Sequence, residues 1–168
     1  MEASKERFKM ITYKTNKTEI KKAFEVAKAR QRSCSNIPDS HDYEGDPLHI
    51  HKVGALGELI FSKVFDFEWS RSVDTFKSEP DVDKYEVRTR TEHWHDLIVR
   101  KDDSDESPFA LVTGDWRKDL EYRVHGWILG GDAKEDKWLK GYGGREPAWF
   151  VPKIFLSSFG EAEDPFDF

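Results

Sequence analysis

The hydrophobic pattern of the chain changes near residue 65, and this change constrains the fold more than any other feature of the sequence. Before it, residues 18–32 and 49–65 carry apolar side chains at three- and four-residue spacing, which is typical of amphipathic helices. After it, short β-like runs alternate with glycine, proline and polar turn residues. A chain of 168 residues without an internal repeat fits one domain. We therefore predict an α/β protein with a central mixed β-sheet flanked by helices.

The pattern also gives the order of the elements. The apolar faces of the two helices are formed by Ile20, Ala23, Phe24 and Ala27 and by Val53, Leu56, Ile60 and Val64. Strands are expected at residues 8–13, 81–82, 85–88, 97–99, 109–112, 122–129 and 148–151. Those between residues 81 and 129 are expected to form a β-meander, with a turn at Asp83 and Lys84. A further helix is predicted over residues 133–140, with Asp132 as its N-cap.

The sequence predicts a cytoplasmic protein. It contains no apolar run of about 18 residues, and its N-terminus lacks the apolar stretch of a signal peptide. Cys34 is the only cysteine, so no internal disulfide can form. We assign residues 1–160 to the domain and residues 161–168 to an acidic C-terminal tail.

The charge of the chain is unevenly distributed. A net charge of −6 argues weakly against a nucleic-acid partner, but residues 1–32 contain ten basic residues against four acidic ones. The tail, 161–168, contains four acidic residues and no basic one. We interpret it as a solubilising terminus, a contact for a protein partner, or a competitor of nucleic acid. A second acidic run, 102–106, is expected in a hairpin loop. A DNA-binding face is compatible with this distribution, and the oligomeric state, including a homodimer, stays open.

Two acidic residues flank the predicted tight turn. Asp81 and Glu86 would lie on adjacent short strands, so their carboxylates can converge. Converging carboxylates repel each other unless a proton or cation lies between them, and oxygen ligands suit Mg²⁺ or Mn²⁺. Arg88 follows Glu86 by two residues and therefore shares its face of the strand. The pattern predicts a divalent-metal site acting on phosphate. The alternative is a surface hairpin, because 36% of the chain is charged.

Glu58 is a third candidate ligand. Its neighbours three and four positions away on the predicted helix are small or apolar. Burying a carboxylate among them costs several kcal/mol of desolvation free energy unless it is paired or binds a metal. The alternative interpretation is a glutamate at the helix edge that pairs with an arginine.

In their order along the chain, these residues resemble the PD-(D/E)XK superfamily of restriction-endonuclease-like nucleases, in particular its small phage-type members. The resemblance rests on Gly57-Glu58 in a helix, followed by Pro80-Asp81 and then Glu86-Val87-Arg88. It extends over roughly residues 49–152. It implies a restriction-endonuclease-like core and a nuclease encoded by a phage or mobile element.

The resemblance also implies roles for the site residues. Mg²⁺ or Mn²⁺ would bind Asp81, Glu86 and the backbone carbonyl of Val87, with Glu58 supporting the metal or the attacking water. Glu58, Asp81, Glu86 and Arg88 would together hydrolyse phosphodiesters of DNA. Arg88 stands where the family has lysine; arginine stays protonated and cannot act as a general base, although it can stabilise phosphate charge. A nuclease-fold protein that binds nucleic acid or a protein partner without cleaving is therefore the alternative.

Histidines, further basic residues and tryptophans give weaker signals. His49 and His51 at the helix entry could contact phosphate or a metal, or be exposed. His93 and His95 have no third histidine or cysteine nearby to complete a zinc site. Candidate phosphate contacts, each equally a surface charge, are Arg90, Arg100, Arg117 and Lys118. Core positions are expected for Trp127, Trp138 and Trp149.

Overall fold

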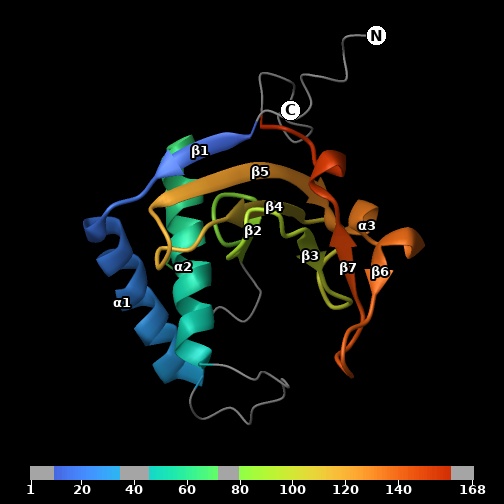
Figure 1. Cartoon of the computed structure of the whole chain (residues 1–168), viewed down its shortest axis with the longest axis horizontal. Coiled ribbons are helices and arrows are strands. Elements are labelled where there is room, and N and C mark those ends of the chain that lie inside the picture. The colour runs from blue at the N-terminus through green and yellow to red at the C-terminus, as the bar shows by residue number, and fades with distance from the viewer. Residues whose placement is uncertain (1–9, 35–45, 72–79, 160–168) are drawn as a thin grey trace.

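The structure, a computed structural model, describes residues 10–34, 46–71 and 80–159 (Figure 1). Strand β1 (Ile11–Lys14) is followed by two long helices, α1 (Lys17–Cys34) and α2 (Pro47–Phe65). The short elements that follow are β2 (Glu86–Arg90), β3 (Leu97–Val99), β4 (Pro108–Thr113), β5 (Glu121–Leu129), α3 (Gly130–Ala133), the 3₁₀ turn η2 (Asp136–Trp138), β6 (Leu139–Lys140), β7 (Ala148–Val151) and the 3₁₀ turn η3 (Lys153–Phe155). Within the described ranges, no helix combines the length and apolar character needed to cross a membrane.

The main sheet is mixed and has four strands in the order β1-β5-β4-β2. β4 and β1 both pair with β5 in the antiparallel sense, whereas β2 runs parallel to β4. The register of β2 and β4 pairs Glu86 with Phe109, Arg88 with Leu111 and Arg90 with Thr113. Because side chains alternate along a strand, Glu86, Arg88 and Arg90 share one face of β2 and Val87 lies on the other. The predicted α/β class with a mixed sheet is confirmed.

The two long helices cover one face of this sheet. Asn16 and Asp46 fix their starts, since their side chains accept hydrogen bonds from the amides of Glu19 (2.9 Å) and Leu48 (3.0 Å). α2 packs on β2 and β4, and α1 packs against α2, as Figure 1 shows. The core on this side contains Leu56, Ile60 and Phe61 of α2 and Val87, Ala110, Val112 and Val124 of the sheet.

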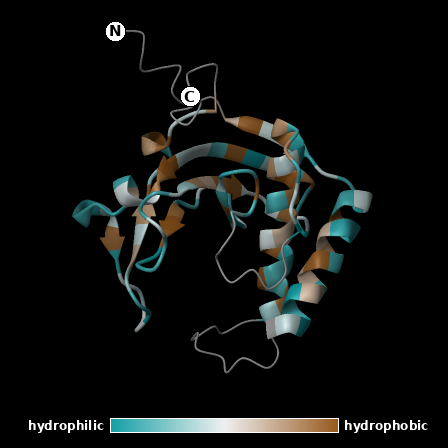
Figure 2. Ribbon diagram, turned by 180° about the vertical axis from the view of Figure 1, so that it is seen from behind, coloured by the Kyte–Doolittle hydropathy of each residue, from teal (hydrophilic) through white to brown (hydrophobic). Residues whose placement is uncertain are grey.

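A second sheet, in the order β3-β7-β6, covers part of the opposite face. β4 lies between the two layers and all six of its residues are buried: Ala110 and Val112 face the helices, while Phe109 and Leu111 face the second sheet. Leu97, Val99 and Val151 join them in this second core. Figure 2 shows hydrophobic residues concentrated in the strands and hydrophilic residues in the connecting loops. The two long helices therefore lie on the same face of the main sheet, whereas Ala133 of the short helix α3 packs in the second core.

The expected β-meander is wrong. β3 leaves the main sheet and pairs antiparallel with β7, and β2 and β4 become parallel neighbours. The predicted strand at residues 81–82 is reduced to a bridge between Val82 and Tyr85 that closes the expected turn. The acidic run 102–106 belongs to the connection between the two sheets, not to a hairpin. Apolar runs as short as 97–99 do not specify which strand they pair with, so the sequence pattern could not separate the sheets.

The expected helix over residues 133–140 is also wrong, because the segment divides into the end of α3, then η2 and β6. Asp132 lies inside α3, whose N-cap is Leu129. Close packing against the preceding loop explains this: the Gly130 and Gly131 amides bond to the Ser107 and Asp105 carbonyls, both at 2.9 Å. The predictions for residues 8–9 and for the tail, 161–168, lie outside the described residues.

Gly57 brings α2 into close contact with β2. A Cβ atom at this position would lie 1.7 Å from Oγ1 and 2.7 Å from Cγ2 of Thr89. No L side chain fits there without moving the helix away from the strand. The next residue, Glu58, is thereby held beside the edge of the main sheet.

We predict that Gly57→Ala lowers the free energy of unfolding by about 1–3 kcal/mol, because the added methyl overpacks the contact with Thr89. Gly54→Ala is the matched control, since its Cβ would meet only Glu58 Oε2 at 4.0 Å. That variant should gain about 0.5–1 kcal/mol from helix propensity. Urea denaturation measures both, and adding Thr89→Ala to Gly57→Ala should recover part of the loss. Equal effects of the two glycine substitutions would contradict this explanation.

Candidate active site

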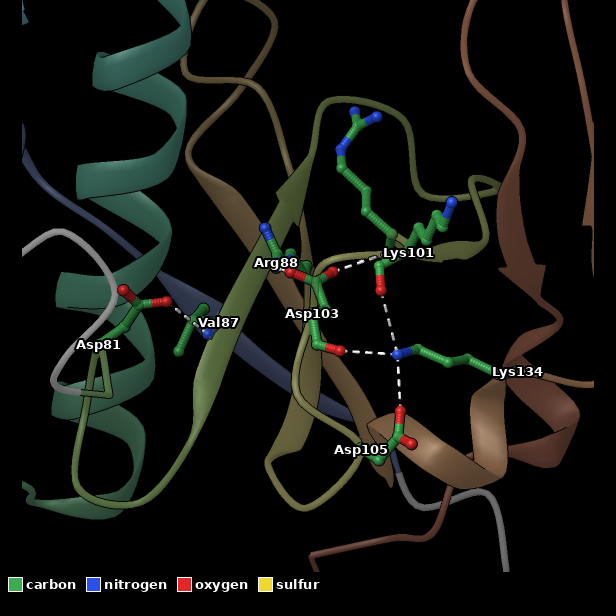
Figure 3. A network of polar contacts seen from close by, with 8 residues as sticks. Asp81, Val87, Arg88, Lys101, Asp103, Asp105 and Lys134 are labelled. Carbon is green, nitrogen blue, oxygen red and sulfur yellow. Dashed lines mark hydrogen bonds and ion pairs between the residues drawn. The ribbon is translucent and has the colours of Figure 1, made fainter.

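Asp81 and Glu86 form a close acidic pair at the free edge of the main sheet. Asp81 Oδ2 accepts a hydrogen bond from the Val87 amide at 2.8 Å, so it covers an amide of the edge strand β2 (Figure 3). The charges of the two carboxyl groups also act on each other, and each carboxyl affects the pKa of the other. In an extended strand the amide and carbonyl of one residue point to the same side, so the Val87 carbonyl faces this edge as well.

The environment of the pair favours its protonated form. Burial, followed by repulsion from Glu86, raises the pKa of Asp81 to about 6. Burial raises the pKa of Glu86 too, while Asp81 and Arg88 oppose this increase. Burial of both carboxyls and the repulsion of Asp81 by Glu86 therefore favour binding of a proton by the pair at mildly acidic pH. A cation placed there would relieve the same repulsion.

Glu58 is buried on α2 and is held by an arginine. Arg30 of α1 donates from Nη1 to Oε2 at 2.7 Å and from Nη2 to Oε1 at 2.9 Å, and Trp69 Nε1 donates to Oε1 at 3.3 Å. The Glu58 side chain is only 5% exposed. Burial raises the pKa of Glu58, the Arg30 hydrogen bonds lower it, and the charge of Asp81 raises it again. The alternative of a glutamate paired with an arginine is thus what the structure shows.

Arg88 lies on the same face of β2 as Glu86 and is held by Asp103. Its Nη2 donates to Asp103 Oδ1 at 2.7 Å, and its guanidinium stacks 5.1 Å from the centre of the Phe109 ring. Asp103 is fixed in turn by the Arg100 amide at 2.7 Å. Figure 3 shows how Lys134 ties down the same loop through the carbonyls of Lys101 and Asp103 and the Asp105 carboxylate.

The four predicted site residues are therefore neighbours, but they are not equivalent. Asp81 and Glu86 affect each other's pKa, and the charge of Arg88 acts on both. Glu58 approaches from the helix side of the edge, with both oxygens engaged by Arg30. In the part of the chain that the structure describes, no three His, Cys, Asp or Glu side chains are arranged to hold a metal ion.

Sequence reasoning missed the residues that position this site. The position of Arg30 could have been recognised from the sequence. Arg30 follows the buried Ala27 by three residues, so it lies on the buried face of α1. An arginine on such a face needs a buried acidic partner. Trp69 and Asp103 carried no such signal, since their roles depend on contacts 11 and 15 residues away in the chain.

His49 and His51 do not form the shared phosphate or metal contact considered from the sequence. His49 and His51 both lie within α2, so they are not extended and do not share a face. His49 packs beside Trp116, with ring centres 5.4 Å apart. Burial lowers the pKa of His51, and the charge of Arg30 lowers it further.

Comparisons with family models, with curated proteins and with solved structures find no match for this chain.

We predict that stability falls as pH rises from about 4 to about 6, because the folded state holds its proton on Asp81 more tightly than the unfolded chain does. Asp81→Asn should flatten this dependence and raise stability at pH 7 by on the order of 3 kcal/mol. Its amide oxygen can still accept from the Val87 amide. Urea denaturation between pH 3.5 and 8 provides the test, with the exposed Asp83→Asn as matched control. Identical pH profiles for Asp81→Asn and wild type would disprove the assignment.

We further predict that Arg30→Met destabilises the protein by about 3–5 kcal/mol, because Glu58 loses its buried partner. The double variant Arg30→Met with Glu58→Leu should recover most of this loss, since no charge is then left uncompensated. Thermal and urea unfolding of both single variants and the double variant form a cycle that isolates the pair. Additive losses would show that the two side chains do not act as a unit.

Proposed function

We propose that the protein is a metal-dependent deoxyribonuclease with a restriction-endonuclease-like core, of the kind found in phages and mobile elements. The observation that carries this proposal is the acidic pair Asp81 and Glu86, buried beside Arg88 at the edge of the main sheet. The pair is destabilising as it stands, because burial and mutual repulsion both raise the pKa of Asp81. Groups with such perturbed pKa values and a specific charged neighbour are candidates for function.

The donor set fits a hard divalent cation. Asp81, Glu86 and the Val87 carbonyl all lie at one edge of the sheet, and oxygen donors of this kind suit Mg²⁺ or Mn²⁺. A bound cation would supply electrophilic stabilisation of the phosphodiester. Glu58 would support the site from the helix side, with its position fixed by the two hydrogen bonds from Arg30.

The remaining catalytic roles are charge stabilisation and proton acceptance. Arg88 cannot accept a proton, but its guanidinium can stabilise charge that develops on phosphate. A bound cation would lower the pKa of the attacking water, so that a lysine at position 88 would not be needed as a base.

A second candidate is a protein with the same fold that binds DNA, or a protein partner, without cleaving. The observation that favours it is that both supporting charges are already engaged. Glu58 forms a two-point ion pair with Arg30, and Arg88 forms one with Asp103 at 2.7 Å. A catalytic role for Arg88 requires its guanidinium to exchange Asp103 for phosphate or to contact both.

The cleavage experiment distinguishes the two candidates. Wild-type protein should cut plasmid or linear DNA with Mg²⁺ or Mn²⁺ and stop cutting in EDTA. Asp81→Asn and Glu86→Gln should each lose roughly two orders of magnitude in rate, the usual cost of removing one electrostatic contributor. Arg88→Lys should keep cleavage and Arg88→Ala should lose it. The exposed Glu25→Gln on α1 is the matched control and should cut as wild type does.

Thermal unfolding adds a readout that is independent of turnover. Mn²⁺ should raise the midpoint of wild type, because it binds only the folded state, and should raise that of Asp81→Asn less. If no DNA is cut while wild type still binds it, the second candidate replaces the first. If Arg88→Ala cuts as fast as wild type, the role assigned to Arg88 is wrong.

A further inference from the structure

Trp94 is the most exposed large hydrophobic side chain in the described part of the chain, at 72%. It lies in the turn that follows β2, and this turn is held in place from several directions. The Glu92 amide donates to His95 Nδ1 at 3.2 Å, and the Arg90 guanidinium donates to the Asp96 carbonyl at 3.0 Å. The turn therefore presents the flat aromatic face of Trp94 to solvent in a fixed position.

Lys153 fixes the tip of the turn. Its Nζ donates to the carbonyls of Trp94 at 2.8 Å and His95 at 3.1 Å, and it lies 3.9 Å from the Asp96 carboxylate. The Trp94 ring also packs on the His95 ring, with centres 4.3 Å apart. The indole is therefore oriented before any partner binds, while one of its faces stays accessible.

A hydrogen-bonded pair of histidines lies beside the turn. The buried Thr113 hydroxyl is 2.7 Å from both His93 Nδ1 and His125 Nε2. The hydroxyl has one proton and two acceptor lone pairs, so at least one of the two rings donates to it. The hydroxyl links the two rings, and each ring keeps its second nitrogen for another contact.

Cationic groups gather around His125. The charges that act on it come from Lys153, His93 and Arg123, and these lower its pKa to about 4 after the larger effect of burial. The Arg123 Nε is buried and has no hydrogen-bond partner among the described residues. Arg123 also pairs with Glu121 at 3.4 Å, but both side chains are partly exposed, at 34% and 48%. Exposed pairs of this kind contribute little, so the Arg123 guanidinium can exchange Glu121 for an anion.

The acidic pair and the turn lie at the two ends of β2. Glu86, Arg88 and Arg90 share a face of β2, and Thr113, which is paired with Arg90, lies on the same face. Arg90 follows Glu86 by four positions, which corresponds to a length of about 13 Å along the strand. This length corresponds to a few nucleotides of a single-stranded nucleic acid.

We propose that Trp94, His125, Arg123 and Lys153 bind an unpaired segment of a nucleic-acid strand. The indole stacks on a base, and the cationic side chains contact the neighbouring phosphate. This inference rests on the proposed nuclease function and specifies it: the strand that reaches Asp81 and Glu86 is single-stranded beyond the cleavage site.

Binding of a labelled oligothymidylate in EDTA tests the inference, with fluorescence anisotropy as the readout and Glu86→Gln as the common background. Adding Trp94→Ala should weaken binding by about 5- to 100-fold, and Trp94→Phe should retain part of it. Tyr142→Ala is the matched control, because Tyr142 is 58% exposed on a different loop, and it should leave affinity unchanged. Arg123→Gln should lower the salt dependence by about one phosphate contact.

An oligonucleotide of abasic sites separates stacking from phosphate contact, since it should bind equally with and without Trp94. Equal affinity of the Trp94→Ala variant and its background for oligothymidylate overturns the inference, as does an equal loss in Tyr142→Ala. If either of these results occurs and wild type still cleaves DNA with metal, the nuclease proposal stands and only the strand-binding inference fails. The opposite result, a Trp94-dependent affinity without cleavage by wild type, removes the nuclease proposal and retains the strand-binding surface.

Discussion

The ion pair between Arg30 and Glu58 is the contact on which the arrangement of this protein depends. Glu58 lies on α2 among buried residues, where a lone carboxylate would be very costly. The two hydrogen bonds from Arg30 make that position possible, and they can form only if α1 lies alongside α2 in one register. Buried pairs of this kind contribute little net stability, because desolvation offsets attraction. We infer that the pair fixes the position of the helices more than it strengthens the fold.

That position determines what happens at the edge of the main sheet. Gly57, adjacent to Glu58, allows α2 to lie directly on Thr89 of β2. The helix therefore brings a third acid toward Asp81 and Glu86, and its charge acts on both. On the other face of β2, Asp103 and the loop held by Lys134 fix Arg88. The edge strand is thus fixed from both faces, while Asp81 accepts a hydrogen bond from the Val87 amide on its outer side.

The sequence predicted the positions of the helices and strands better than it predicted which strands pair with each other. α1 and α2 were predicted nearly to the residue because a helical period extends over many positions. β3 was predicted as a strand, but three apolar residues cannot specify which sheet they join. The helix predicted over residues 133–140 is instead a single turn, α3, which begins at Gly130 because Gly130 and Gly131 lie in close contact with the loop at 104–107. The acids of the site were found from their spacing, whereas Arg30 and Asp103 depend on contacts 28 and 15 residues apart.

The acidic pair is the part of the structure that a purely structural role explains least. A hairpin needs only one acceptor for the Val87 amide, and an asparagine at position 81 would provide it without repulsion from Glu86. The chain instead places two interacting carboxyls in a partly buried position, and burial raises the pKa of both. Folded proteins commonly give up stability in this way where a ligand or a reaction requires it. Arg30 neutralises Glu58 and Asp103 engages Arg88, so Asp81 and Glu86 are the charges of this site that a bound cation would compensate.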